Sequence, residues 1–444
     1  MVSAFLNAFR TPDLRKKILF TLGIVVLLRL GSTIPTPNVN ASAIRACATD
    51  ATSGESAGVY SMINMFSGGA LLHLSIFALG VMPYITSSIV LQLLTVVIPR
   101  LETLKKEGGS GQQKITQYTR YLTLVLAVLQ ATAFVTLATS GQLFQGCTLP
   151  LVYDASVFPI IVMILTMTAG TGVIMWLGEL ITDRGVGNGM SIMIFTQIAA
   201  SFPTGLWAIK TAHKGATGWF LFFTVIGIGL LVMLAIVWIE QGQRRIPVQY
   251  AKRMVGRRLV GGSTTYIPLK VNQSGVIPVI FASSLIYIPH LITQLVTAGD
   301  PNASNGWWSK AVAKYLTNPA DPVYIAIYFG LIIFFTYFYV SITFNPDERA
   351  DEMKKFGGFI PGIRPGKPTA DYLRYVLSRI TLPGSIYLGL IAVLPNLFLQ
   401  SGGSSAQNLP FGGTAVLIMI GVGLDTVKQI ESQLMQRNYE GFLK

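Results

Sequence analysis

The sequence predicts an all-α integral membrane protein with ten transmembrane helices in two five-helix halves of inverted orientation. Three observations support this fold class. Hydrophobic residues make up 51% of the chain and charged residues only 12%, whereas about a quarter of a soluble domain is charged. Uncharged runs recur along the chain and are too long for a soluble core to bury. The net charge is +14, yet the lysines and arginines gather in a few connecting segments, as in membrane proteins with basic cytoplasmic loops.

The hydrophobic runs are long enough to cross a bilayer, which takes about 20 residues in a helix. In chain order they lie at about residues 18–37, 76–98, 117–138, 155–177, 186–203, 218–240, 274–297, 322–344, 375–400 and 412–434. The run at 186–203 is the weakest, because it is short and begins with polar residues. A shorter apolar segment, at about 60–71, precedes the second run and is too short to cross.

The placement of lysine and arginine predicts which side each connection faces. Most of them lie at the two ends of the chain or in every second connection, and few lie in the alternate connections. The positive-inside rule therefore puts the basic segments and both chain ends in the cytoplasm. A division into residues 1–203 and 204–444 gives each half an odd number of runs, which forces the halves into opposite orientations.

Two of the cytoplasmic connections, at about 241–273 and 345–374, are unusually long. Both mix basic clusters with turn residues, and loops of this length usually carry function. Contact with anionic lipid headgroups is one interpretation. Docking of a large cytoplasmic partner is the favoured one, because the loops are longer than an anchor needs.

Six short motifs follow one another along the chain. They are Asn64–Ala70 leading into Ser75–Ile85, then Asp183–Gly189, then Gln243–Arg245 with Tyr250–Arg253, then Pro268–Asn272 with Gly275–Pro278, then Ile360–Gly366, and last Gly412–Thr414. Together they resemble the SecY family of bacterial protein-conducting channels over nearly the whole chain. The resemblance implies a central pore between the halves and a short re-entrant plug helix. It also implies the channel subunit of the general secretory translocase, which passes unfolded polypeptides across the cytoplasmic membrane and releases transmembrane segments sideways into lipid.

The resemblance implies a ring of apolar residues that closes the pore. Such a ring gates by excluding water and then yields to a polymer, whereas rings of charge would select ions. It maps to Val81, Ile85, Met190, Ile194, Ile280 and Ile418. The i, i+4 spacing puts the first two on one helix face, and likewise the next two. Ordinary helix packing is the alternative for each residue taken alone.

The segment 60–71 corresponds to the plug of the family. A piece that does not span is tolerated only where protein or a water-filled cavity surrounds it. The implied residues are Ser61, Asn64, Phe66, Gly68 and Gly69. The two glycines would form its hinge, since glycine permits backbone angles that other residues avoid. A plain external loop with an apolar patch is the alternative.

A lateral gate is implied between the second and third runs on one side and the seventh and eighth on the other. Small hydroxylated and amide residues lie there: Thr86, Ser87 and Gln92, facing Ser283 and Ser284. Interhelical polar contacts are weak, at about 0.6 kcal/mol on average, which suits a seam that opens. Routine helix-to-helix contact is the alternative.

The long basic loops are expected to bind the SecA motor ATPase or the ribosome, which would supply the energy. Arginine suits both RNA phosphates and the carboxylates of a motor protein. The implied residues, with Arg364 foremost, are Arg244, Arg245, Lys252, Arg253, Arg257, Arg258, Arg364 and Lys367. The other implied partners are the small membrane subunits SecE and SecG, the signal sequences of exported proteins, and membrane lipid.

Two other function classes fit less well. An ion-coupled transporter shares the inverted halves but normally needs ionisable residues at the membrane midplane. Arg29 lies inside the first run, and we expect it to snorkel to the cytoplasmic face. An enzyme is not indicated, because no metal-ligand or phosphate-loop motif fits, and no cofactor or metal is expected. Cys47 and Cys147 fall on the external side, as a disulfide or as two free thiols.

Overall fold

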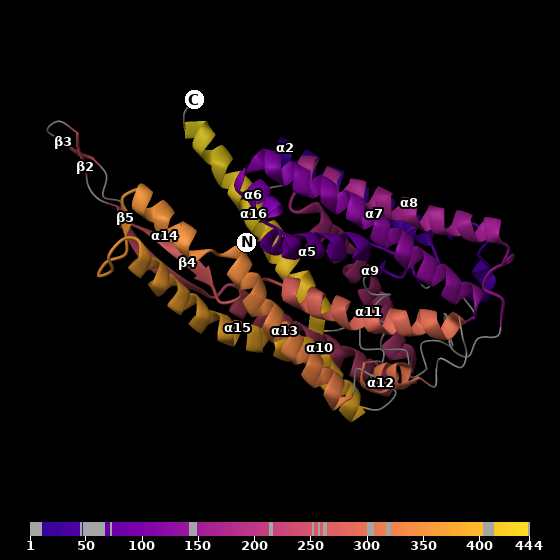
Figure 1. The fold of residues 1–444 in the computed structure, drawn as a ribbon. Coiled ribbons are helices and arrows are strands. Elements are labelled where there is room, and N and C mark those ends of the chain that lie inside the picture. The colour runs from indigo at the N-terminus through magenta and orange to yellow at the C-terminus, as the bar shows by residue number, and fades with distance from the viewer. Residues whose placement is uncertain are drawn as a thin grey trace.

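The structure, a computed structural model, describes residues 11–44, 47, 67–71, 73–141, 149–212, 216–250, 253–255, 258–260, 264–299, 306–316, 321–402 and 413–442. Each of the ten predicted runs coincides with a long helix (Figure 1). In the first half these helices are α2 (Pro12–Thr33), α5 (Met82–Val97), α7 (Gly109–Thr139), α8 (Val157–Arg184) and α9 (Gly189–Ala212). In the second half they are α10 (Ala216–Glu240), α11 (Ile277–Gly299), α13 (Pro322–Thr343), α15 (Lys367–Gly402) and α16 (Gly413–Phe442).

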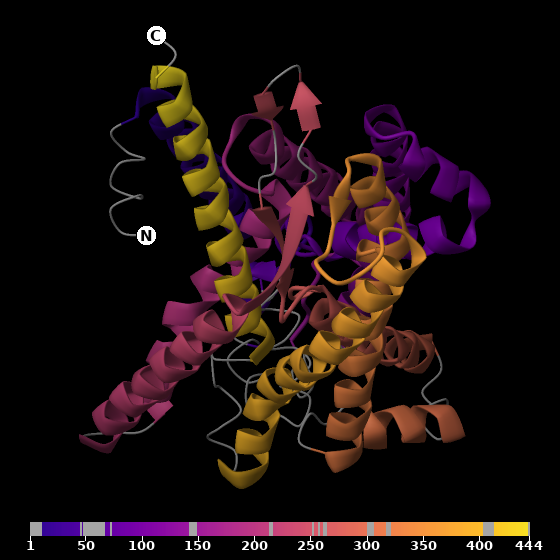
Figure 2. The same cartoon turned by 90° about the vertical axis from the view of Figure 1, so that its left-hand side faces the viewer.

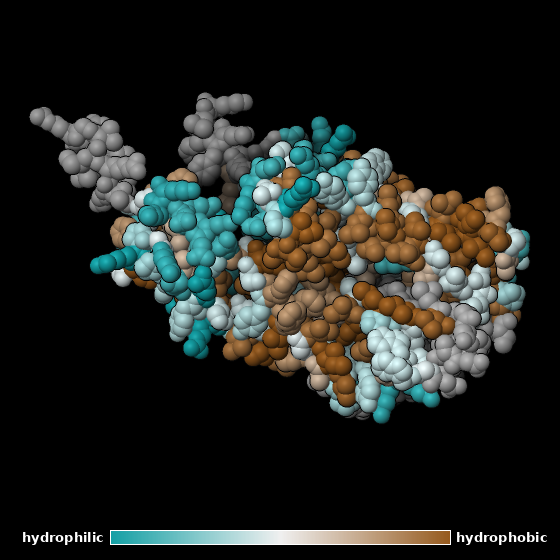
Figure 3. Space-filling model, viewed as in Figure 1, coloured by the Kyte–Doolittle hydropathy of each residue, from teal (hydrophilic) through white to brown (hydrophobic). Residues whose placement is uncertain are grey.

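Exposed apolar side chains of the helices form a belt around the molecule. Within the described residues, 6 helices are long and apolar enough to cross a membrane, and α5 forms a seventh candidate with α6 (Pro99–Lys106), to which it is joined at a 100° bend. The helices α9 and α11 contain shorter apolar stretches, Gly189–Pro203 and Ile277–Ile286. Figure 3 shows the belt in brown across the middle of the molecule, with hydrophilic residues gathered toward one end. Large apolar side chains such as Leu165, Phe220 and Trp238 are exposed there, as expected of a surface that faces lipid.

Several helices extend beyond the runs that predicted them. The helix α7 begins eight residues before its run at 117–138, α15 begins eight residues before its run at 375–400, and α9 continues past residue 203 to Ala212 with Pro203 inside it. Hydropathy detects only the part of a helix that lies in lipid, so polar first turns such as Lys367–Arg374 escape it. The run at 186–203 is shorter than the helix that contains it, because this helix ends at Ala212.

The two long connections contain regular structure that the all-α prediction missed. The strands are β1 (Gln243–Tyr250), β2 (Arg253–Val255), β3 (Arg258–Val260), β4 (Thr264–Lys270) and β5 (Gly358–Phe359). A three-stranded sheet has the order β4-β1-β5, and β2 pairs with β3. The second connection also contains α14 (Pro346–Lys355). The sheet is a minor part of a helical protein, but it joins both connections into one unit.

The sheet packs on helices of the second half. From Arg245 to Gln249 of β1, the side chains alternate between exposed and buried. Ile246 and Val248, together with Leu269 of β4, join a buried cluster with Val340 of α13 and Leu373 of α15. Because one face of the sheet is buried in this way, the register of the strands is fixed. The strands lie at one end of the molecule, here called the sheet end, and α12 (Trp307–Tyr315) lies at the opposite end (Figure 2).

At the opposite end, the chain after α2 pairs with the chain before α8. Val39 forms a bridge with Val152. The Asn38 side chain donates to the Asp154 carbonyl at 2.6 Å and accepts from the Asp154 amide at 3.0 Å. Cys47 is disulfide-bonded and fully buried, which decides between the two states left open by the sequence. Cys147, the other cysteine of the chain, lies outside the described residues.

Within the first half, two kinds of contact hold the helices together. Gly170 of α8 lies so close to the Ile76 carbonyl that a Cβ atom would collide with this backbone group. On the side of α8 nearer the sheet end, Arg120 of α7 forms a forked pair with Glu179, with Nε to Oε1 at 2.7 Å and Nη2 to Oε2 at 2.8 Å. Between the halves, α9 contacts α10 and α16, and α11 contacts α5 and α7. These junctions position the candidate site.

Candidate functional site

The two halves meet at a buried apolar cluster, here called the central cluster. It contains the predicted ring residues Val81, Met190, Ile194, Ile280 and Ile418, each no more than 8% exposed, with Ile85 packed against them. These six residues come from the start of α5 and from α9, α11 and α16. Both halves thus contribute to the cluster, and the structure brings together every residue that the family resemblance implied for the ring.

The central cluster is larger than the predicted ring. Ile198 lies one turn after Ile194 on α9, and Val422 lies one turn after Ile418 on α16. Phe77, before α5, and Ile24 and Leu28 of α2 also belong to it. The i, i+4 periodicity that relates Met190 to Ile194 continues through Ile198, so the sequence carried a signal for the further α9 member.

Beside the cluster lies a tight turn of residues 67–71. The Leu71 amide donates to the Ser67 hydroxyl at 3.2 Å, and the Ala70 amide donates to the Ser67 carbonyl at 3.3 Å. Gly68 and Gly69 have φ angles of 64° and 91°, in the region that favours glycine. The predicted plug residues Ser61, Asn64 and Phe66 lie outside the described residues. The described part of the plug segment is therefore its last turn.

The turn lies between α2 and α9. On one side, Arg29 Nη1 of α2 donates to the Gly68 carbonyl at 2.6 Å. On the other side, a Cβ atom on Gly68 would come within 3.1 Å of Gln197 Cα, one turn beyond Ile194 on α9. The expectation that Arg29 snorkels to the cytoplasmic face is thus wrong, because its guanidinium donates to the Gly68 carbonyl instead.

The predicted gate residues lie on α5 and α11, which are in contact. Their hydroxyl groups bond within their own helices rather than across the seam. Ser87 Oγ donates to the Pro83 carbonyl at 2.7 Å, Thr86 Oγ1 donates to the Met82 carbonyl at 2.9 Å, and Ser283 Oγ lies 3.0 Å from the Val279 and Ile280 carbonyls. Ser87 and Ser283 are buried. The seam at these positions is made by packing.

The last two gate residues differ from the others. Ser284 is buried, and its hydroxyl has no hydrogen-bond partner within the described chain. Gln92 is exposed, and its Nε2 donates to Ser88 Oγ at 3.4 Å, one turn earlier on the same helix. Gln92 is therefore not buried in a contact with α11.

The strands β1 to β4 of the first connection pair as β1 with β4 and β2 with β3, and they are here called the hairpin. The predicted docking residues of this connection lie on the hairpin, at the sheet end. Arg244 and Arg245 are exposed on β1, opposite Leu269 and Pro268 of β4. Arg253 lies in β2 and Arg258 in β3, which pair in the antiparallel sense. Lys252 and Arg257 lie outside the described residues.

The docking residues of the second connection lie beside the hairpin. Arg364 is exposed in the turn before α15, between two glycines of positive φ, and its carbonyl accepts from Thr369 Oγ1 at 2.8 Å. Lys367 is exposed at the first position of α15. Because β5 pairs with β1, the exposed arginines of both connections belong to one folded surface.

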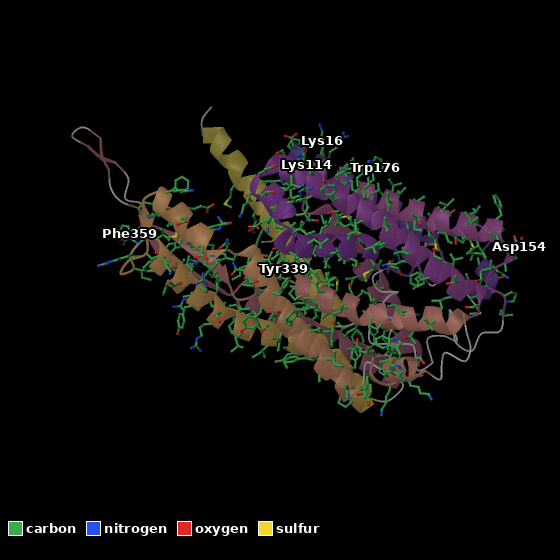
Figure 4. All side chains as sticks on the ribbon, in the orientation of Figure 1. Lys16, Lys114, Asp154, Trp176, Tyr339 and Phe359 are labelled. Atoms are coloured by element: carbon green, nitrogen blue, oxygen red, sulfur yellow. The ribbon has the colours of Figure 1, made fainter. Side chains whose placement is uncertain are left out.

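Charged residues also mark the two ends of the helical bundle. Figure 4 shows Lys16 and Lys114 on the side of the first half nearer the sheet end, whereas Asp154 lies at the opposite end. This distribution agrees with the asymmetry of lysine and arginine along the sequence.

A sequence profile of the SecY family matches residues 75–427. The chain belongs to the SecY family. It is 67% identical to the protein translocase subunit SecY of Mycobacterium tuberculosis over 445 residues, with 100% of both chains covered. It is 63% identical to the protein translocase subunit SecY of Streptomyces griseus over 446 residues, again with 100% of both chains covered.

Solved structures of SecY and Sec61 channels share the fold. One, the structure of a protein-conducting channel, has a TM-score of 0.62 at 19% identity and covers 94% of this chain and 91% of its own. Another, Sec61 in the canine ribosome–channel complex from the endoplasmic reticulum, has a TM-score of 0.59 at 18% identity and covers 94% of this chain and 91% of its own. The predicted family and fold class are thus confirmed, and SecY proteins are channel subunits rather than enzymes.

Proposed function

We propose that this SecY-family chain forms the channel through which unfolded polypeptides cross the bacterial cytoplasmic membrane, and from which transmembrane segments leave sideways into lipid. The observation that supports this most strongly is the central cluster. A junction that is apolar, buried and built by both halves does not let ions pass, and it opens only when the halves separate. The chain has no nucleotide-binding motif, so a partner supplies the energy.

The six ring residues act as a dewetted constriction in this proposal. Apolar side chains with no charge around a narrow passage exclude water, and ions cannot cross where water is excluded. A translocating chain displaces the side chains and fills the opening that it makes. The turn 67–71, which lies against α9, ends the segment that acts as the plug in this proposal.

Polar substitution within the ring tests the proposal. We expect Ile418→Ser to raise the ion conductance of the resting, purified translocase in planar bilayers, because a hydroxyl group favours wetting of the constriction. Ile332→Ser is the matched control, since Ile332 is also 0% exposed but lies in the second-half core. Equal conductance of the two variants, both inserted and folded, would contradict a constriction at the central cluster.

The seam between α5 and α11 serves as the lateral gate. Buried serines that bond to their own helices leave the two surfaces joined by packing alone, and packing between helices in lipid has no hydrophobic driving force. Such a seam separates without leaving unpaired hydroxyl groups at Thr86, Ser87 and Ser283. A signal sequence that enters from the channel thereby reaches lipid.

The sheet end is the cytoplasmic docking surface, and both chain termini lie on the same side of the membrane. SecA and the ribosome bind there through the exposed arginines of both connections. SecE and SecG pack around the apolar belt. A cysteine introduced at Lys354 should react with a membrane-impermeant maleimide in inverted vesicles but not in intact cells, and the reverse pattern would contradict this orientation.

A further inference from the structure

Arg29 occupies an unusual position for a charged residue. It lies near the end of α2, one turn before Thr33, in a helix that is otherwise uncharged from Ile18 onward. A charge inside a membrane-spanning segment is rare and is normally paired or functional. The only acceptor that the described residues give to the Arg29 guanidinium is the carbonyl of Gly68, at 2.6 Å. This pairing crosses from α2 to the end of the plug segment.

The chain after Gly68 has two attachments of different strength. Farther along, it is firmly tied to the end of α2. The Thr36 amide and hydroxyl both donate to the Leu74 carbonyl, at 3.0 Å and 2.6 Å, and the Ile76 amide donates to the Ile34 carbonyl at 3.0 Å. These bonds are buried or belong to backbone pairing, so they form a fixed anchor at Leu74–Ile76.

The turn before this anchor is held differently. Its contact with α9 is made by packing of Gly68 on Gln197. Gln197 is buried, and its Oε1 has no hydrogen-bond partner within the described chain, so this side chain does not tie the turn through that oxygen. The hydrogen bond from Arg29 therefore links the turn to a neighbouring helix. A single bond from a charged donor is directional and can break without disturbing the anchor.

We propose that the Arg29 guanidinium is a latch that holds the turn 67–71 seated against α9, and that release of this latch precedes displacement of the plug. The inference rests on the proposed function and adds to it the residue that positions the plug. Arg29 is a positioning residue, since it acts on the seal through Gly68. Arginine suits the role because its planar fork is long, always charged and preorganised for an oxygen acceptor.

The position of the turn gives a direct test. Ala70 is fully buried, so a cysteine there in the purified translocase complex should react slowly with a water-soluble maleimide. The native disulfide at Cys47 does not react. Adding Arg29→Met, which keeps an unbranched apolar side chain but removes the donors, should raise the labelling rate of A70C at least tenfold and should raise resting conductance. An unchanged labelling rate would overturn the latch.

Two further variants keep the test decisive. Arg379→Met is the matched control, because Arg379 lies within α15 and its guanidinium is placed over the Tyr375 ring rather than on the turn. This variant should leave the labelling of A70C unchanged. Arg29→Lys keeps the charge without the fork and should give an intermediate labelling rate. If Arg29→Met does not accumulate, wild-type labelling in Arg29→Lys would overturn the latch by itself.

The conductance of Ile418→Ser separates this inference from the proposed function. If Ile418→Ser conducts and Arg29→Met labels and conducts like wild type, the latch is wrong while the channel stands. If Ile418→Ser and Arg29→Met both fail to conduct but Arg29→Met still exposes A70C, the turn is latched but the constriction lies elsewhere.

Discussion

At the scale of single residues, close contacts between helices depend on glycine, which has no Cβ atom. Gly170 of α8 faces the Ile76 carbonyl, and the absence of a Cβ atom lets the two backbones touch. Gly172 lies two residues later on the same helix, and a Cβ atom there would meet only Leu124 Cδ2 at 3.8 Å. The first glycine is required by a backbone neighbour that cannot rotate away, and the second is not.

The two glycines therefore give a matched pair of substitutions. Gly170→Ala should destabilise the protein by about 2 kcal/mol, as overpacking of a tight contact does, because α8 must move away from Ile76. Gly172→Ala should be neutral. The thermal midpoint of the purified protein in mild detergent measures both. A Gly170→Ala variant as stable as Gly172→Ala would contradict the close approach.

Arg364 provides a second prediction at this scale. Its side chain is exposed in the turn before α15, so its replacement should leave the fold intact. Arg364→Glu should weaken binding of the motor protein by roughly tenfold or more, since a reversed charge repels the partner. Lys354→Glu is the control for net charge, because Lys354 is exposed on α14 at the same end. Motor binding and export by membrane vesicles give the readout, and equal effects of the two variants would remove the special role of Arg364.

At the residue scale, the sequence predicted that the ring residues lie together, but it did not predict the hydrogen bonds of the gate residues. The ring residues are apolar at helical spacing, so their burial in one cluster follows from their type. The partner of a serine or threonine does not follow in this way. Thr86, Ser87 and Ser283 bond to carbonyls in the preceding turn of their own helices, a choice set by side-chain rotamer and local packing, which residue type and spacing do not specify.

At the scale of elements, the sheet was the main feature missed. Ile246, Val248 and Tyr250 alternate with Pro247 and Gln249 along β1, a period of two that is typical of a half-buried strand. This signal is short, and it lies next to the basic residues Arg244 and Arg245. The pairing of β5 with β1 was not available from any local pattern, because it joins segments about a hundred residues apart.

The packing of the sheet on the second half can be tested on one strand. Val248 is 1% exposed and Gln249 is exposed on the other face. Val248→Asp should destabilise the sheet by at least about 2 kcal/mol, because it buries a charged group without a partner, and should make the hairpin sensitive to trypsin. Gln249→Asp should not. Equal resistance to trypsin in both variants would show that the hairpin does not depend on this contact.

At the scale of the whole molecule, hydropathy and charge predicted the ten long helices, their order and the end at which the basic residues gather, but not the shorter helices α6, α12 and α14 of the described chain. They did not predict the course of the 67–71 turn, because its position depends on Arg29 and Gln197, which are distant in the sequence and carry no shared pattern. The predicted run at 186–203 ends nine residues before α9 does, and the predicted run at 117–138 begins eight residues after α7 does, for the same reason. Hydropathy indicates the part of a helix that contacts lipid, whereas the helix itself continues as long as its backbone hydrogen bonds continue.

A covalent link across the seam tests the relation between the halves. Cysteines at Ser87 and Ser283, joined by a short bifunctional maleimide, should block export by the assembled translocase, because α5 and α11 could then no longer separate. Either cysteine alone, treated in the same way, should leave export unchanged. Normal export by a fully crosslinked pair would place the opening at another pair of helices.

The disulfide at Cys47 sets an order of events in the making of this chain. The cytosol keeps thiols reduced, and disulfides persist on the outer side of the membrane. With the proposed orientation, a newly synthesised chain delivers the segment that follows α2 to the outer side before this bond forms. Each chain therefore exists first as an inserted precursor with reduced thiols. The fraction of chains that contain the disulfide rises with time after synthesis, so this fraction reports how long ago the chains were made.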